Sequence, residues 1–189
     1  MIFYLVFTLI ILQRLCELKV ASKNERWMKE KGGYEVGEEH YSLMVLMHSA
    51  FFITLLLEVL ILDKELTSFW PFLAILFLVT QAMRVWALLS LGKYWNTKII
   101  VLPNTTIVKK GPYKYLRHPN YVIVIVEILL IPLLFQAYWT AAIFSILNAW
   151  MLSVRIPLEE KALMAETDYQ EKFAKISRFS PIPLKKCND

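Results

Sequence analysis

The stretch LMVLMHSAFFITLLLEVLIL, from Leu43 to Leu62, decides the class of fold. About 20 apolar residues in a helix are enough to cross the roughly 30 Å hydrocarbon core of a bilayer. The whole chain of 189 residues agrees with this, because 57% of it is hydrophobic and only 20% is charged. A soluble domain carries about 45–50% apolar and about 25% charged residues. We therefore expect an integral membrane protein.

Four further apolar stretches lie on either side of this one. The last two are separated only by Gln136 and Ala137, and the fourth is short and contains Pro132, so these two predict a tight helical hairpin. The predicted fold is all-α, a polytopic transmembrane helix bundle of about five spans. The four stretches are Ile2 to Cys16, Phe69 to Leu91, Tyr121 to Phe135 and Tyr138 to Ile156.

Lysine and arginine residues are concentrated after the first, third and fifth stretches, whereas Lys64 stands alone between the second and third. Cytoplasmic loops carry an excess of these residues. The sequence therefore predicts that these three segments are cytoplasmic and that the N-terminus lies outside. The net charge of +5 then reflects this asymmetry and attraction to anionic lipid headgroups, and it requires no nucleic acid.

The tail is predicted to form an amphipathic cytoplasmic helix of its own. Arg155-Ile156-Pro157 is expected to end the fifth span, and Pro157 suits the first turn of a new helix. Residues spaced by three and four then form an apolar face that can lie on the membrane or under the bundle. They are Leu158, Ala162, Ala165, Tyr169, Phe173 and Ile176.

The loop Gly92 to Asn120 contains six basic residues and no acid, and it runs directly into the fourth span. Pro119 favours an extended His118 just ahead of that helix. Arg117, His118 and Tyr121 are therefore expected near a helix N-terminus, which is a place to hold an anionic or polar group. A plainer interpretation is a loop that binds lipid headgroups and carries interfacial tyrosines.

A second polar cluster, Arg155, Glu159 and Glu160, lies at the cytoplasmic end of the fifth span. The acids could simply offset the helix dipole, at about 0.3–1 kcal/mol each. Because the fourth and fifth spans form a short hairpin, their cytoplasmic ends must be neighbours, and we expect this cluster to face the loop. Within the spans, where a charge costs at least about 2.5–3.5 kcal/mol, we expect Arg84 and Glu127 to pair.

The composition also excludes several kinds of site. The chain has five glycines and no Gly-x-Gly pair, which excludes a Rossmann or P-loop nucleotide site. Cys16 and Cys187 are too few and too far apart for a disulfide framework or a zinc site. We therefore predict no metal.

Three motifs of the second half occur together in one known family. They are Leu91-Gly92-x-x-Trp95, Gly111-Pro112-Tyr113-x-x-x-Arg117-His118-Pro119-Asn120-Tyr121, and Arg155-x-x-x-Glu159-Glu160-x-x-Leu163 followed by Tyr169. Over about Arg84 to Pro181 the chain resembles isoprenylcysteine carboxyl methyltransferases and their membrane relatives, which include phospholipid methyltransferases.

The first half resembles a small bacterial branch of this family, linked to O-methylation of lipid-tailed polyketides such as alkylpyrones and alkylresorcinols. The motifs that carry this are Asn24-Glu25-x-Trp27, Gly33-x-Glu35-x-Gly37-x-x-His40-Tyr41 and His48.

The resemblance implies S-adenosylmethionine (SAM) as the cofactor, bound at the cytoplasmic face without a Rossmann fold. His118, Pro119 and Tyr121 match the family's cofactor-binding segment, and Tyr113 and Arg117 flank it. Glu159 and Glu160 match the acidic pair that closes the same pocket. Glu159, Glu160 and Arg155 are the candidate catalytic residues; if a base is needed, one of the two carboxylates or His118 is the candidate.

We therefore expect a SAM-dependent methyltransferase of the bacterial cell membrane with its active site facing the cytoplasm. Residues 1–91 would form three transmembrane helices with a basic loop, and residues 92–189 the catalytic part. The expected partners are membrane lipids and a lipophilic acceptor that enters from the bilayer, with a hydroxyl ahead of a carboxyl and an amine. The alternatives are a small proton-coupled transporter using Glu127, Arg84 and His48, and a non-catalytic assembly subunit.

Overall fold

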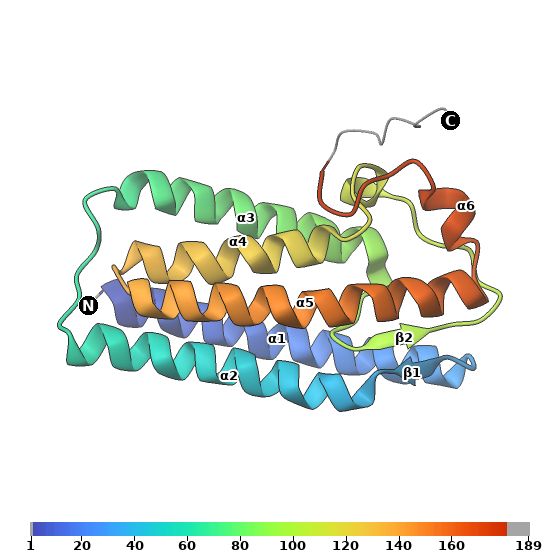
Figure 1. Cartoon of the computed structure of the whole chain (residues 1–189), viewed down its shortest axis with the longest axis horizontal. Helices are drawn as coiled ribbons and strands as arrows, with labels where there is room; N and C mark the ends of the chain where they lie inside the picture. The colour runs from blue at the N-terminus through green and yellow to red at the C-terminus, as the bar shows by residue number, and fades with distance from the viewer. Residues whose placement is uncertain (1, 181–189) are drawn as a thin grey trace.

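The computed structural model describes residues 2–180, which form five long helices and a small cap of short elements at one end (Figure 1). Helix makes up 74% of the chain, and the prediction of an all-α membrane bundle is confirmed. Cys187 and the end of the predicted catalytic part lie outside the described residues. The long helices are α1 (Ile2–Glu30), α2 (Glu38–Ile61), α3 (Trp70–Leu91), α4 (Pro119–Leu134) and α5 (Tyr138–Glu166).

Three of these helices, α2, α3 and α5, are long and apolar enough to cross a membrane. Helix α4 is also apolar but has only 16 residues. The number of spans, about five by sequence, stays a prediction.

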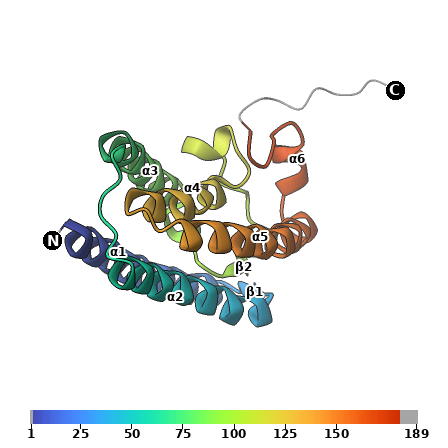
Figure 2. The same ribbon diagram turned by 60° about the vertical axis from the view of Figure 1, so that its left-hand side comes forward.

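The long helices form two layers, with α1 and α2 in one and α3, α4 and α5 in the other (Figure 2). Helix α4 packs between α3 and α5, and α2 packs against α5. Near the N-terminus the layers are joined by aromatic pairs in edge-to-face geometry. The ring centroids of Phe51 and Phe144 are 5.5 Å apart, and those of Phe3 and Phe135 are 4.9 Å apart. In lipid such close packing, rather than exclusion of water, holds helices together.

The cap contains a two-stranded antiparallel ribbon that the sequence did not predict. Strand β1 (Tyr34–Val36) pairs with β2 (Ile99–Val101), with Glu35 opposite Ile100. Three-residue strands are too short to show an alternating pattern, which explains the omission. The ribbon ties the loop after α3 to the segment after α1. The other cap elements are η1 (Gly92–Tyr94), η2 (Gly111–Lys114) and α6 (Tyr169–Phe173).

Helix α1 is longer than the first apolar stretch. The basic residues Lys19, Lys23, Arg26 and Lys29, predicted to lie in a loop, are on the helix. That part of the prediction is wrong, because these polar residues form further helical turns beyond the apolar segment.

Helix α5 does not end at Pro157 as predicted, but continues to Glu166. Proline removes the bond from its nitrogen to the carbonyl four residues back. Here both Pro157 and Ser153 lie on the exposed side of the helix, so that the carbonyl left without its helical donor is at the surface. The predicted amphipathic tail helix is thus the last part of α5 followed by the separate α6.

Candidate functional site

The turn at Gly111 positions the first site residue. Gly111 has φ of 53°, a region that favours glycine. A Cβ atom there would also come within 2.0 Å of Ser90 Oγ. Glycine therefore lets the loop press against α3, and the turn of η2 that follows buries Pro112 and Tyr113.

His118 is the N-cap residue of α4 and so lies just ahead of the helix, as the sequence predicted. The helix begins at Pro119, two residues before the start of the predicted stretch. The chain after α6 holds this segment in place. The backbone nitrogen of Arg117 donates to the carbonyl of Ser177 at 3.1 Å. Its guanidinium Nε donates to the carbonyl of Ile176 at 2.5 Å. The loop thus enters α4 against a second segment of chain that keeps it from moving away.

Glu160, only 4% exposed, ties these segments together. Its carboxylate lies 3.0 Å from His118 Nε2 and accepts from Arg178 Nη2 at 2.6 Å. The hydroxyl of Tyr169 donates to it at 3.4 Å. The carboxylate raises the pKa of the Arg178 guanidinium. Burial, and then the charges of Glu160 and Glu159, raise the pKa of Tyr169, so that its hydroxyl stays protonated and can donate.

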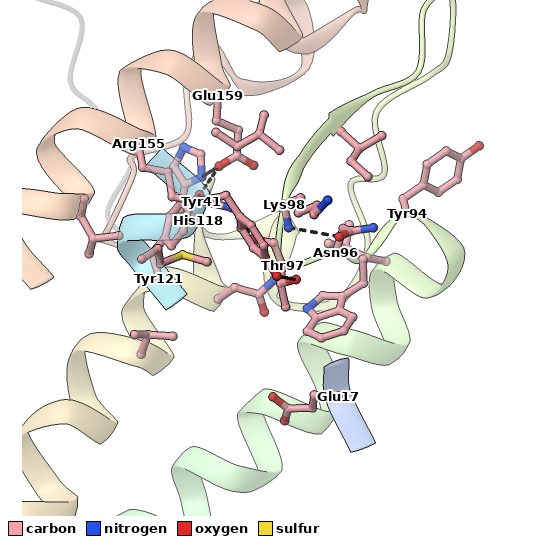
Figure 3. Close-up of a pocket in the computed structure, with 18 of the residues that line it drawn as sticks. Glu17, Tyr41, Tyr94, Asn96, Thr97, Lys98, His118, Tyr121, Arg155 and Glu159 are labelled. Carbon is pink, nitrogen blue, oxygen red and sulfur yellow. Dashed lines mark hydrogen bonds and ion pairs between the residues drawn. The ribbon is translucent and has the colours of Figure 1, made fainter. Parts of the chain in front are cut away.

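Glu159 and Arg155 of α5 both contact Tyr121, which lies in the first turn of α4. The hydroxyl of Tyr121 donates to Glu159 Oε2 at 2.5 Å and accepts from Arg155 Nε at 3.0 Å. Arg155 Nη2 also donates to the carbonyl of Thr97 at 2.5 Å. Figure 3 shows Tyr121, Arg155 and Glu159 gathered around His118 and Tyr41. The expectation that the two polar clusters face one another is confirmed.

A cavity of about 500 Å³ opens beside these groups and reaches down into the bundle. This volume is in the range of small-molecule sites, about 300–1,000 Å³. Among the predicted site residues, the cavity is not lined by Pro119 or Glu160, and their contact with a cofactor stays a prediction. Those that line it are Tyr113, Arg117, His118, Tyr121, Arg155 and Glu159.

Comparison with known proteins assigns the region that contains this site to a family. Residues 73–165 match the isoprenylcysteine carboxyl methyltransferase (ICMT) family, and that range contains both polar clusters. The chain is 53% identical over 161 residues to the uncharacterized protein YpbQ of Bacillus subtilis (strain 168), covering 85% of this chain and 96% of that protein. It is 31% identical over 162 residues to an uncharacterized protein of Haemophilus influenzae (strain ATCC 51907 / DSM 11121 / KW20 / Rd), covering 83% and 92%.

The chain belongs to the ICMT family. Members of the family are SAM-dependent methyltransferases of the membrane. The cavity at the cap end of this ICMT-family protein is thus the candidate site for such chemistry.

Tyr113 is the group that best marks a ligand position in the ICMT-family cavity. Its hydroxyl is buried and has no hydrogen-bond partner within residues 2–180. Burial, and then the negative charge of Glu159, raise the pKa of this phenol, so that it stays protonated. A buried hydroxyl without a partner costs free energy, and a bound polar group would satisfy it.

A second cluster of charged and polar residues lies deeper in the bundle, among α1, α3 and α4. Arg84 Nε donates to Glu127 Oε1 at 3.0 Å, which confirms the predicted pair. Arg14 Nη2 donates to Glu127 Oε2 at 2.6 Å, and Glu17 accepts from Arg14 at 2.7 Å and from Arg84 at 3.1 Å. Gln81 donates to Glu127 at 2.7 Å. We refer to Arg14, Glu17, Gln81, Arg84 and Glu127 as the deep network.

Sequence reasoning missed three contributors to the site. Tyr41 had appeared only within a motif of the bacterial branch; its hydroxyl lies 3.4 Å from Thr97 Oγ1. Thr97 accepts a hydrogen bond from Arg155 through its backbone carbonyl, which every residue type has, so the sequence could not indicate it. Arg178 was counted only as a basic residue of the tail, and its pairing with Glu160 depends on how the tail folds back.

Proposed function

We propose that this protein transfers a methyl group from SAM to an oxygen of a lipophilic acceptor. The observation that carries the proposal is the cavity itself. One wall presents a carboxylate, a guanidinium, an imidazole and phenols from the loop and the end of α5, and the remaining wall is largely apolar and continues into the bundle.

The residues at the cap end fit the cofactor chemically. SAM carries an ammonium, a carboxylate, ribose hydroxyls and a positively charged sulfur, and it supplies an electrophilic methyl group when bound. Glu159, Arg117, His118 and the unpartnered hydroxyl of Tyr113 would hold these groups. Glu159 suits a cation, because its side chain remains 27% exposed while Tyr121 fixes one of its oxygens.

Arg155 is suited to a positioning role. It is 5% exposed and fixes both the Tyr121 hydroxyl and the Thr97 carbonyl. Methyl transfer is an in-line displacement, so most of the acceleration can come from orientation and exclusion of water. Glu159 and Glu160 remain the other candidate catalytic residues.

The acceptor is proposed to reach the cavity from the bilayer, between α1 and α2. Leu15 and Leu18 of α1 and Val45 of α2 line the cavity. The same three side chains are also 50%, 44% and 44% exposed on the outside of the molecule. Apolar residues that belong both to a cavity wall and to a lipid-facing surface suit a hydrocarbon tail.

The polar cap supports a position of the site at the cytoplasmic face of a bacterial cell membrane. The basic loop, the basic end of α1 and the described part of the tail all lie at this end (Figure 1). Under the positive-inside rule this end faces the cytoplasm.

The test is methyl transfer in membranes that contain the protein. Membranes are incubated with methyl-labelled SAM, and label in the lipid extract is measured for the wild type, Glu159→Gln and Glu166→Gln. Glu166 is the control, since it lies at the end of α5 and does not line the cavity.

We expect label in an ether or ester of a lipid, a loss of at least tenfold for Glu159→Gln, and wild-type transfer for Glu166→Gln. Absence of labelled lipid with the wild type, or equal transfer by Glu159→Gln, would overturn the proposal.

A further inference from the structure

His48 lies on α2 and lines the same cavity, but the site described above makes no use of it. It follows Tyr41 by seven residues, which is two helical turns or about 10 Å along the axis. Asn148 of α5 precedes Arg155 by the same seven residues, and Glu127 of α4 follows Tyr121 by six. Tyr41 and Arg155 both bond to Thr97, and Tyr121 bonds to Arg155, so these three residues lie at one level. His48, Asn148 and Glu127 also line the cavity and form a second polar level deeper in the bundle.

A hydrogen bond to the backbone fixes the tautomer of the His48 ring. Nδ1 lies 2.9 Å from the carbonyl oxygen of Met44. A carbonyl can only accept, so Nδ1 carries the hydrogen, and in the neutral ring Nε2 is then an acceptor with a free lone pair. No hydrogen bond to Nε2 is formed within the described part of the chain. The structure thus presents a base on the wall of the cavity.

Asn148 adds a donor and an acceptor at this level. Its side chain is only 3% exposed and lines the cavity, and it forms no hydrogen bond to another described residue. Because this amide lines the cavity and has no partner among the described residues, it is available to a polar group of a ligand. The two unpaired groups, on α2 and α5, lie on helices that pack against each other.

The charged groups of the deep network are paired with one another, so His48 and Asn148 are the groups at this level that a ligand can use. The carboxylates of Glu17 and Glu127 are paired with Arg14 and Arg84, and these pairs also occupy Nη1 and Nη2 of Arg14. The titratable groups that line the cavity around His48 are Tyr41 on α2, Arg14 and Glu17 on α1, Arg84 on α3, Tyr121 and Glu127 on α4, and Arg155 and Glu159 on α5.

We propose that His48 is the general base of the reaction and that, with Asn148, it binds the head of the acceptor. Such a base suits the lipid-tailed phenols and enols that the resemblance to the bacterial branch already implies, and what is new here is the residue that takes the proton. A carboxylate is already ionised and needs no base, whereas a phenol or enol must lose its proton. This inference rests on the proposed methyl transfer.

In the step proposed, the O–H bond of the acceptor breaks and its proton moves to Nε2 of His48. The electron pair stays on the oxygen, which forms the new bond to the donor's methyl carbon, and the pair of the old carbon–sulfur bond stays on the sulfur. The imidazolium returns its proton to solvent afterwards. While the oxygen is negative, the imidazolium and the amide of Asn148 stabilise its charge.

The first test needs no cofactor. Detergent-purified protein is mixed with a nitrophenol that carries a long alkyl chain, and absorbance of the phenolate is followed against pH. The variant is His48→Asn, whose amide can still donate to the Met44 carbonyl. The control is His40→Asn, the same change on the same helix at a histidine that does not line the cavity.

The phenol bound to the wild type and to His40→Asn should ionise at least about one pH unit lower than with His48→Asn. The same ionisation midpoint in wild type and His48→Asn, or no binding of the phenol by the wild type, would overturn the inference.

The second test separates this inference from the proposed function. With SAM and a lipid-tailed phenol, transfer by His48→Asn should fall about 100-fold at neutral pH and approach the wild-type rate at alkaline pH. SAM binding should be unchanged. Equal pH profiles would contradict the role of His48, whereas a wild type that binds no SAM would contradict the proposed function and leave the phenol titration as a separate result.

Discussion

The cap-end site and the deep network both bring several charges together in the bundle, but they differ in how the charges are satisfied. In the deep network, Glu127 accepts from Arg14, Gln81 and Arg84. At the cap end, Tyr113 has no partner within residues 2–180, and Glu159 is partly exposed to the cavity. Charge within a membrane protein therefore identifies a binding site only where groups are left without internal partners.

Breaking the deep network should produce the largest effect on stability. Arg84→Met leaves the buried carboxylate of Glu127 with one cation fewer, and removing one partner of a buried pair costs about 3–5 kcal/mol. We expect a clear fall in Tm in detergent. The double variant Arg84→Met/Glu127→Met should be more stable than Arg84→Met alone, because no unpaired carboxylate remains. A double variant less stable than both single variants would show that the charges do more than pair.

His118→Ala should have the next largest effect, on the cap-end side of the comparison. The ring contacts Glu160 and lines the cavity, so its removal should abolish SAM binding measured by calorimetry. His118→Gln keeps a polar side chain and should weaken binding less. Tm of each variant separates loss of binding from loss of fold. Unchanged SAM binding by His118→Ala would contradict the site assignment.

The smallest effect is expected at a surface group near the ribbon. Lys98 lies 3.0 Å from Glu25 and 2.9 Å from Glu35. Burial acts to lower the pKa of Lys98, but the two carboxylates outweigh it and raise the pKa to about 12. Burial likewise acts to raise the pKa of Glu25, and the ammonium groups of Lys29 and Lys98 outweigh it and lower that pKa.

A carboxyl group whose pKa is lowered stabilises the fold above its usual value of 4.5, and this contribution is lost as the pH falls through the lower folded value. Lys98→Met should therefore lose at most about 1 kcal/mol at pH 7. Thermal unfolding of the two proteins should converge below about pH 4. A difference that stays constant down to pH 3 would rule out the ion pairs as its cause.

Much of the fold could be predicted from sequence, because apolar length and proline placement report directly on helices in lipid. The hairpin of α4 and α5 and the approach of the His118 segment to the end of α5 that carries Glu159 and Glu160 were predicted in this way. The end of α5 was not, because Pro157 breaks a helix only where the lost hydrogen bond is costly. The ribbon and the Thr97 carbonyl were also missed, since backbone groups pair without regard to side-chain type.

The site residues were predicted as a group, but the sequence could not distinguish adjacent glutamates. Glu159 lines the cavity, whereas Glu160 does not and instead contacts Arg178 and His118. Which side each carboxylate faces depends on the rotation of α5 against the folded tail. The identity of partner groups inside the bundle, such as Arg14 with Glu127, depends in the same way on packing between helices far apart in the chain.

The most direct test of the cap-end site is SAM binding to the detergent-purified wild type and to Tyr113→Phe. The substitution removes one hydroxyl that has no partner in the described chain, so Tm should not fall. If a ligand satisfies this hydroxyl, affinity should drop by about 5–10-fold, equivalent to about 1–1.4 kcal/mol. Binding by the wild type with this drop is the predicted result; no binding by the wild type, or equal affinity in the two proteins, would contradict the account.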